Sequence, residues 1–141
     1  MSPAGASAGG RPRLYSYPKC STCRRALKWL VAEGLVVDLI DITLSPPTRQ
    51  QLEQVWSNLA DPRRLFNTSG ASYRALGAAR VKAMSPDEAI AALAADGRLI
   101  RRPLLWVDGG PLLTGFDPEV WREALKPLLP GAGPDQSPAA P

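Results

Sequence analysis

The sequence predicts an α/β domain in which a βαβ unit, a block of helices and a ββα unit share one mixed, four-stranded sheet. Short apolar and β-branched runs alternate with stretches whose apolar residues recur at helical spacing. Capping and turn residues mark where these stretches begin and end. The length of 141 residues and the hydrophobic share of 45% fit a single domain.

The predicted βαβ unit opens the folded part of the chain. Residues 14–17 are expected to form a strand that ends at Pro18, and a helix is expected over about residues 21–33, ended by Gly34. Residues 35–41 supply the second strand. Because a crossover helix joins them, the two strands should run parallel.

One face of the predicted helix carries Leu27, Leu30 and Val31 at positions i, i+3 and i+4, and Cys23 lies four residues before Leu27. This spacing predicts that all four side chains are buried. Cys20, in contrast, lies at the start of the helix, where its side chain should be exposed.

Helices dominate the middle of the chain. Thr48 and Ser85 each open a capping box, because Gln or Glu follows three residues later. The two boxes predict helices to about residue 57 and to about residue 95. Shorter helical turns are expected after Asp61 and over residues 73–76. The first of the long helices should bury Leu52, Val55 and Trp56.

The ββα unit follows this block. Residues 104–107 predict a third strand, residues 108–110 (Asp-Gly-Gly) a tight hairpin, and residues 111–114 the return strand. Asp117 is the expected N-cap of the last helix. A βαβ half joined to a ββα half is the plan of a thioredoxin-like fold, here with a helical insertion between the halves.

Two terminal segments differ from the rest in composition. Residues 1–12 and 129–141 are rich in Gly, Pro, Ala and Ser and contain few residues that could form a core. Such segments bury too little apolar surface to offset the entropy of ordering. We therefore expect two disordered tails around a folded domain over residues 13–128.

Composition excludes several classes of site. The chain has no histidine, which excludes Ser-His-Asp triads, Cys-His dyads and His-ligated metals, and its two cysteines are too few for a four-thiolate site, so no metal is expected. No apolar run reaches about 18 residues and the N-terminus lacks a signal-peptide pattern, so we expect a cytoplasmic protein without a membrane partner. The net charge of +4 is spread along the chain, which favours neither DNA nor RNA as a partner. We expect a monomer.

A Cys-x-x-Cys pair lies where the first strand meets the first helix. Cys20 would stand at the helix N-terminus, where free N–H groups and the helix dipole favour a thiolate. Lys19, Arg24 and Arg25 add positive potential. Cys23, one turn later, is placed to attack a mixed disulfide formed at Cys20. We therefore predict that Cys20 is the attacking thiol, that Cys23 resolves, and that the two form a redox disulfide.

Other interpretations of the pair exist. The cysteines could be packed core residues, half of an intermolecular zinc site, or a structural disulfide, which a reducing cytoplasm disfavours. Packed core cysteines would leave unexplained why the pair stands at a strand-to-helix junction of a βαβ unit, a placement typical of redox motifs.

Arg101, Arg102 and Pro103 precede the third strand. In a thioredoxin-like layout a proline at this point faces the Cys-x-x-Cys loop, often through a cis peptide bond. The alternatives are a trans proline at the start of a strand and two surface arginines.

Four motifs together resemble the arsenate reductase (ArsC)/Spx/MgsR family. They lie at residues 15–26, 66–77, 99–104 and 115–116, in the order found in that family. The resemblance covers about residues 14–125 and implies a thioredoxin-like fold with a helical insertion. It is greatest to the members with a Cys-x-x-Cys pair.

The resemblance implies three functions. The first is a thiol–disulfide oxidoreductase with Cys20, Cys23 and Arg102 as catalytic residues, and with glutathione, glutaredoxin or thioredoxin as reductant and no bound cofactor. Its substrate would meet Ser21, Thr22 and Pro103. The second is an Spx-like, redox-switched regulator that binds the C-terminal domain of the RNA polymerase α subunit.

The third implied function is glutathione- and glutaredoxin-dependent arsenate reduction, in which three arginines bind the oxyanion. Arg102 matches one of them, whereas Asn67 and Phe116 stand near the positions of the other two. Cys23 stands where those enzymes have serine. These departures favour the thiol–disulfide activity over arsenate reduction.

Overall fold

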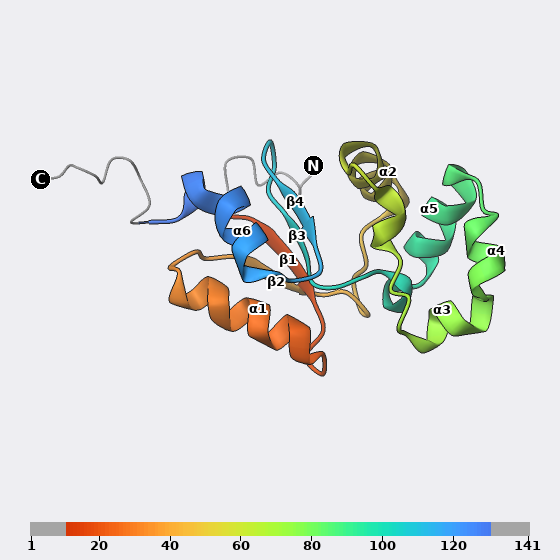
Figure 1. Cartoon of the computed structure of the whole chain (residues 1–141), viewed down its shortest axis with the longest axis horizontal. Helices are drawn as coiled ribbons and strands as arrows, with labels where there is room; N and C mark the ends of the chain where they lie inside the picture. The colour runs from red at the N-terminus through yellow and green to blue at the C-terminus, as the bar shows by residue number, and fades with distance from the viewer. Residues whose placement is uncertain (1–10, 131–141) are drawn as a thin grey trace, which may run out of the picture.

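One mixed sheet of four strands organises the chain, which a computed structural model describes over residues 11–130 (Figure 1). The strand order is β2-β1-β3-β4. β1 pairs parallel with β2 and antiparallel with β3, and β3 pairs antiparallel with β4, which confirms the predicted βαβ and ββα halves. The strands are β1 (Arg13–Ser16), β2 (Asp38–Asp41), β3 (Leu104–Trp106) and β4 (Leu112–Thr114).

Two helices, α1 (Ser21–Ala32) and α6 (Pro118–Leu125), cover one face of the sheet. Asp117 caps α6 as predicted, since its carboxylate accepts from the backbone N–H groups of Glu119 and Val120. Burial of apolar area on this face is a main source of stability. The buried residues of this layer are Leu14, Ala26, Leu30, Leu105, Trp121, Leu125 and Leu129.

The insertion between β2 and β3 forms a second layer, separated from α1 and α6 in Figure 1. Both predicted capping boxes are present, at Thr48 and at Ser85. The buried residues Leu52 and Val55 pack in the core of this layer, and Trp56 is half-buried beside them. The helical elements are α2 (Arg49–Asn58), the 3₁₀ turn η2 (Pro62–Leu65), α3 (Ala71–Leu76), α4 (Ala78–Lys82), α5 (Pro86–Ala95) and the 3₁₀ turn η3 (Gly97–Leu99).

A close approach of backbones fixes the insertion to the sheet. Gly97, in η3, is buried and lies so near the backbone oxygen of Ile42 that a Cβ atom at this position would collide with it. Ile42 directly follows β2, and its own N–H donates to the oxygen of Ser16. Only glycine fits between the end of the insertion and the β1–β2 pair.

Two local predictions are wrong: the residue at which β2 begins and the burial of Val31. β2 begins at Asp38 rather than at residue 35, because β1 begins to pair only at Arg13, opposite Asp38. Val31 is 70% exposed, because the buried stripe of α1 is formed by Cys23, Ala26 and Leu30. Each residue turns the helix by about 100°, so Val31 lies well to one side of that stripe.

The expected tails overlap slightly with the folded part. The oxygen of Pro12 accepts a hydrogen bond of 2.8 Å from the N–H of Asp38, and Leu129 is buried among the residues of the α1–α6 layer. The remainder of the two expected tails, residues 1–10 and 131–141, lies outside the described residues.

None of the helices within residues 11–130 combines the length and the hydropathy that a membrane span requires.

Candidate functional site

The loop between β1 and α1 places Cys20 as the N-cap of the helix. The loop turns tightly, since the N–H of Cys20 donates to the oxygen of Tyr17 at 3.0 Å. The Cys20 backbone is extended (φ −96°, ψ 117°), and its Sγ accepts a hydrogen bond of 3.3 Å from the backbone N–H of Cys23. A sulfur atom therefore occupies the place where a serine or aspartate oxygen would cap a helix.

The two sulfur atoms differ in environment. Burial of the Cys20 sulfur raises its pKa, but hydrogen bonds from the thiol and N–H of Cys23, together with the positive charge of Arg102, outweigh burial and lower the pKa below its ordinary value. Cys23 is 1% exposed, and burial, reinforced by the neighbouring Cys20 sulfur, raises its pKa to about 11. The environment thus stabilises the thiolate form of Cys20 and the protonated thiol form of Cys23.

Arg102 reaches the site from the segment before β3. The Arg102–Pro103 peptide bond is cis, so the trans alternative is wrong. The guanidinium of Arg102 stacks over the ring of Tyr17 at 5.1 Å and donates to the oxygen of Arg98 at 3.4 Å. Pro103 is buried, and its oxygen accepts from the N–H of Gly115 at 2.9 Å, which ties the proline to the end of β4.

Ser21 and Thr22 form the first turn of α1. Ser21 is exposed and Thr22 half-buried. N–H groups in the first turn of a helix have no intrahelical acceptor, so this turn can bind an anionic group next to Cys20. The structure therefore brings Cys20, Cys23 and Arg102 together and places Ser21 and Thr22 beside them.

Asn67 joins the site from the insertion. Its side-chain amide donates to the oxygen of Arg98 at 3.4 Å, the same oxygen that accepts from Arg102. Asn67 is held there because its N–H donates to the oxygen of Leu99 at 2.8 Å. The family resemblance is the only sequence signal that marks this residue, because it precedes β3 by more than 30 residues.

Phe116, in contrast, belongs to an aromatic cluster. Its ring lies 6.0 Å from that of Trp29 and 5.0 Å from that of Trp121, both edge-on. The guanidinium of Arg25 stacks on the same ring at 5.9 Å. Phe116 therefore packs α1 against α6 and supplies no charge to the site.

Tyr17 and Ser16 are site residues that residue-by-residue interpretation missed. The ring of Tyr17 stacks against the guanidinium of Arg102. Ser16 is 7% exposed, and its hydrogen bond with the Cys23 thiol partly opposes the rise in the pKa of Cys23. Their place at the end of β1 and directly after it, within four residues of Cys20, is a signal that could have marked them.

An apolar pocket of about 420 Å³ adjoins Cys23 on the side of β2. It lies between α1 and the carboxyl ends of β1 and β2. The residues that line the pocket include Tyr17, Pro18, Cys23, Leu27, Leu39 and Ile40.

Among residues 11–130, no cluster of three or more Cys, Asp or Glu side chains could hold a metal ion.

Comparison with known proteins agrees with this arrangement. The family model described as the ArsC family matches residues 15–124. The uncharacterized protein YusI of Bacillus subtilis (strain 168) is 40% identical over 112 residues, which are 78% of this chain and 94% of YusI. The regulatory protein MgsR of the same strain is 29% identical over 106 residues, 74% of this chain and 82% of MgsR.

A solved structure is similar in the same region. The crystal structure of a possible arsenate reductase from Streptococcus mutans UA159 superposes with a TM-score of 0.68 and 45% sequence identity, over 74% of this chain and 90% of that one. The matched region contains both cysteines, Arg102 and the insertion. With its thioredoxin-like fold, its Cys-x-x-Cys loop and its Arg-Pro motif, the chain belongs to the ArsC family.

Proposed function

We propose that this protein is a small thiol–disulfide oxidoreductase that works through Cys20 and Cys23. The observation that carries the proposal is the asymmetry of the pair. The half-buried Cys20 caps α1 and has a lowered pKa, whereas the buried Cys23 has a raised pKa. An attacking thiol must be ionised and accessible, and a resolving thiol should stay protonated until it is needed.

The reaction follows from this order. The Cys20 thiolate attacks one sulfur of a substrate disulfide, forms a mixed disulfide with it, and displaces the other sulfur as a thiolate, which takes a proton from water. Cys23 then loses its proton and attacks the Cys20 sulfur, which releases the second substrate thiolate. The substrate gains two electrons and two protons, and the Cys20–Cys23 pair becomes a disulfide.

The first step prepares the second. While Cys20 is a thiolate, its hydrogen bond and its charge contribute to the raised pKa of Cys23. A mixed disulfide at Cys20 carries no charge, so this contribution is lost and Cys23 ionises more easily. Burial continues to raise the pKa of Cys23 and keeps it from reacting with other oxidants.

The remaining residues support the attacking sulfur and its substrate. Arg102 supplies the positive charge that stabilises the Cys20 thiolate or a bound carboxylate. We expect the substrate to contact the α1 turn at Ser21 and Thr22 and the segment at Pro103. Glutathione, glutaredoxin or thioredoxin would return the pair to the dithiol, each by the same exchange chemistry.

Disulfide turnover tests the proposal. The purified protein should reduce hydroxyethyl disulfide with glutathione or with thioredoxin as electron donor, and Cys20→Ser should abolish this turnover. Cys23→Ser should accumulate a mixed disulfide that mass spectrometry detects at Cys20. Full turnover by Cys20→Ser would show that the pair is not the catalyst.

A second candidate is a redox-switched regulator that binds the C-terminal domain of the RNA polymerase α subunit. The similarity to the regulatory protein MgsR favours it. Titration of that domain with the oxidised and the reduced protein would test it, and binding should differ between the two states. Absence of binding in both states would exclude this candidate.

Arsenate reduction has less support. Arg102 is the cation whose charge lowers the pKa of Cys20, while Asn67 is neutral and Phe116 is held in the aromatic cluster. A doubly charged oxyanion would therefore find fewer guanidinium groups than the family resemblance requires. Arsenate turnover with glutathione and glutaredoxin tests this directly.

A further inference from the structure

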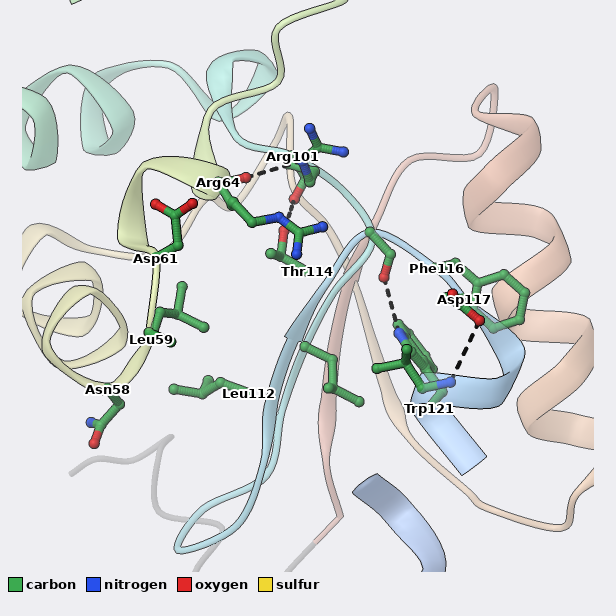
Figure 2. Close-up of a pocket in the computed structure, with 14 residues that line it drawn as sticks. Asn58, Leu59, Asp61, Arg64, Arg101, Leu112, Thr114, Phe116, Asp117 and Trp121 are labelled. Carbon is green, nitrogen blue, oxygen red and sulfur yellow. Dashed lines mark hydrogen bonds between the residues drawn. The ribbon is translucent and has the colours of Figure 1, made fainter. Parts of the chain in front are cut away.

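A second hollow, of about 560 Å³, lies along the outer edge of β4 (Figure 2). β4 forms one wall of the hollow, and the segment 58–61 at the end of α2 forms the facing wall. Arg64 and Arg101 lie beside Thr114, and Trp121 lies near the start of α6. We call this hollow the β4 groove.

The backbone of β4 exposes hydrogen-bonding groups to the groove. β4 is an edge strand, and the N–H of Gly115 donates to the oxygen of Pro103 while the N–H of Val107 donates to that of Pro111. In an antiparallel pair, hydrogen-bonded residues alternate with residues whose groups point away. With Leu112 opposite Trp106 and Thr114 opposite Leu104, the N–H and C=O groups of Leu112 and Thr114 therefore point outward, away from β3.

Hydrogen bonds hold the groove open. The Nε of Arg101 donates to the oxygen of Arg64 at 3.0 Å, and the N–H of Arg101 donates to that of Leu65. The hydroxyl of Thr114 donates to the oxygen of Arg101 at 3.1 Å. Arg101 thus joins η2 to β4, and the distance between the two walls is fixed before any ligand binds.

The groove offers two chemically different places along the strand. Beside Leu112, the half-buried Leu59 supplies an apolar wall. Beside Thr114, the exposed side chain of Arg64 extends from η2 toward β4 (Figure 2). Within the described part of the chain, neither Arg64 nor Arg101 has a carboxylate within ion-pair distance.

We propose that the β4 groove binds an extended peptide segment of a partner protein, which adds a strand to β4. The partner backbone pairs with the outward groups of Leu112 and Thr114. Its side chains at positions i and i+2 lie on the same face of the added strand. An apolar side chain at one position contacts Leu59 and Leu112, and a carboxylate at the other pairs with Arg64. The partner sequence is therefore apolar-x-acidic.

Charge argues against a second copy of this chain in the groove. If a second β4 paired with the first, the residues opposite Leu112 and Thr114 would come from Leu112–Thr114 of that copy, which carries no carboxylate. The added strand itself would then offer no carboxylate to Arg64. An acidic peptide from another protein would place a carboxylate opposite Arg64.

A short peptide probe tests the proposal. The probe is a fluorescein-labelled five-residue peptide, Thr-Val-Thr-Glu-Thr, compared with the peptide in which lysine replaces glutamate and with one that is N-methylated along the backbone. Fluorescence anisotropy should show binding of the glutamate probe alone. In ¹⁵N spectra the amide signals of Leu112 and Thr114 should shift and exchange more slowly with solvent.

Matched variants locate the contacts. Arg64→Gln should weaken binding by about tenfold, the loss expected for one charge-assisted hydrogen bond, whereas Arg80→Gln, an exposed arginine on α4, should leave it unchanged. Thr114→Pro removes an outward N–H and should abolish binding. If that variant fails to fold, the N-methylated probe makes the same test on the unaltered protein.

Three results would overturn the proposal. Equal binding of the glutamate and lysine probes would show that Arg64 does not bind the carboxylate of the peptide. Unchanged amide signals of Leu112 and Thr114 would show that the peptide does not pair with β4. A dimer in light scattering that dissociates in Thr114→Pro would show that a second copy fills the groove. Cys20→Ser should bind the probe like the unaltered chain, so this test is independent of the proposed redox activity.

Discussion

Asn67 and Arg102 donate to the same acceptor, the backbone oxygen of Arg98, each at 3.4 Å. One residue comes from the insertion and the other from the approach to β3, so a single carbonyl joins both halves of the site. Asn67 is uncharged, so of these two residues only Arg102 adds positive charge near the Cys20 sulfur.

A substitution at Asn67 tests this. Asn67→Arg adds a second guanidinium beside Arg102, so the pKa of Cys20 should fall further and millimolar arsenate or sulfate should protect Cys20 from alkylation. Thr68→Arg, an exposed neighbour, is the matched control and should give no protection. Equal protection in both variants would mean that the position of Asn67 does not face the anion site.

The pKa of Cys20 can be measured from its reactivity. In a Cys23→Ser background, the rate of iodoacetamide alkylation as a function of pH should have its inflection below the ordinary thiol pKa. Arg102→Ala should move the inflection upward, because it removes a positive charge that stabilises the thiolate. Arg102→Lys keeps the charge and should restore most of the shift. An inflection that stays in place in Arg102→Ala would remove Arg102 from this role.

Cys23 makes the stability of the reduced protein depend on pH. Its folded-state pKa of about 11 lies above that of an exposed thiol, so folding favours the protonated form. This contribution is complete below about pH 8.5 and is lost as the pH rises through the folded-state value. The loss should amount to roughly 3 kcal/mol for this 1% exposed group.

Urea unfolding of the reduced protein at pH 8 and pH 11 measures this loss. Cys23→Ala removes the titrating group, so the variant should lose less stability between the two pH values than the unaltered chain does. Tyr15, whose pKa is raised by burial, is present in both proteins, so its contribution cancels in the comparison. An identical loss in both proteins would contradict the burial of the Cys23 thiol.

Gly97 should be intolerant of any side chain. Gly97→Ala would push a Cβ into the backbone oxygen of Ile42, and a backbone atom cannot rotate away. The insertion would have to shift relative to β1 and β2, at a cost of about 1–3 kcal/mol typical of overpacking. The midpoint of thermal unfolding measures this cost. A midpoint equal to that of the unaltered chain would show that η3 lies farther from β2.

The parts of the fold that the sequence predicted well are those governed by local chemistry. The Cys20 helix start, the capping boxes at Thr48 and Ser85, and the hairpin at Gly109 each depend on side chains within a few residues of one another. Their physical causes are therefore present in short stretches of sequence, and the structure confirms each of them.

The parts that it missed depend on distant partners. The sequence of α4 lacks a capping signal, and the helix is completed by Arg63, whose guanidinium donates to the oxygens of Val81 and Met84 at 3.2 and 2.6 Å. The extent of β2 likewise depends on where β1 begins to pair, and the position of Asn67 depends on how the insertion folds back. No short-range pattern contains this information.

The Cys20 sulfur that caps α1 is also the atom that attacks the substrate in the proposed reaction. As long as Cys20 is ionised, its negative charge faces the positive end of the helix and the Cys23 N–H. Any covalent bond to Cys20, whether to a substrate or to Cys23, neutralises that charge and weakens the start of the helix, and only reduction of the pair restores the charged cap. The first turn of α1 thus favours the reduced, ionised form of Cys20 over either disulfide.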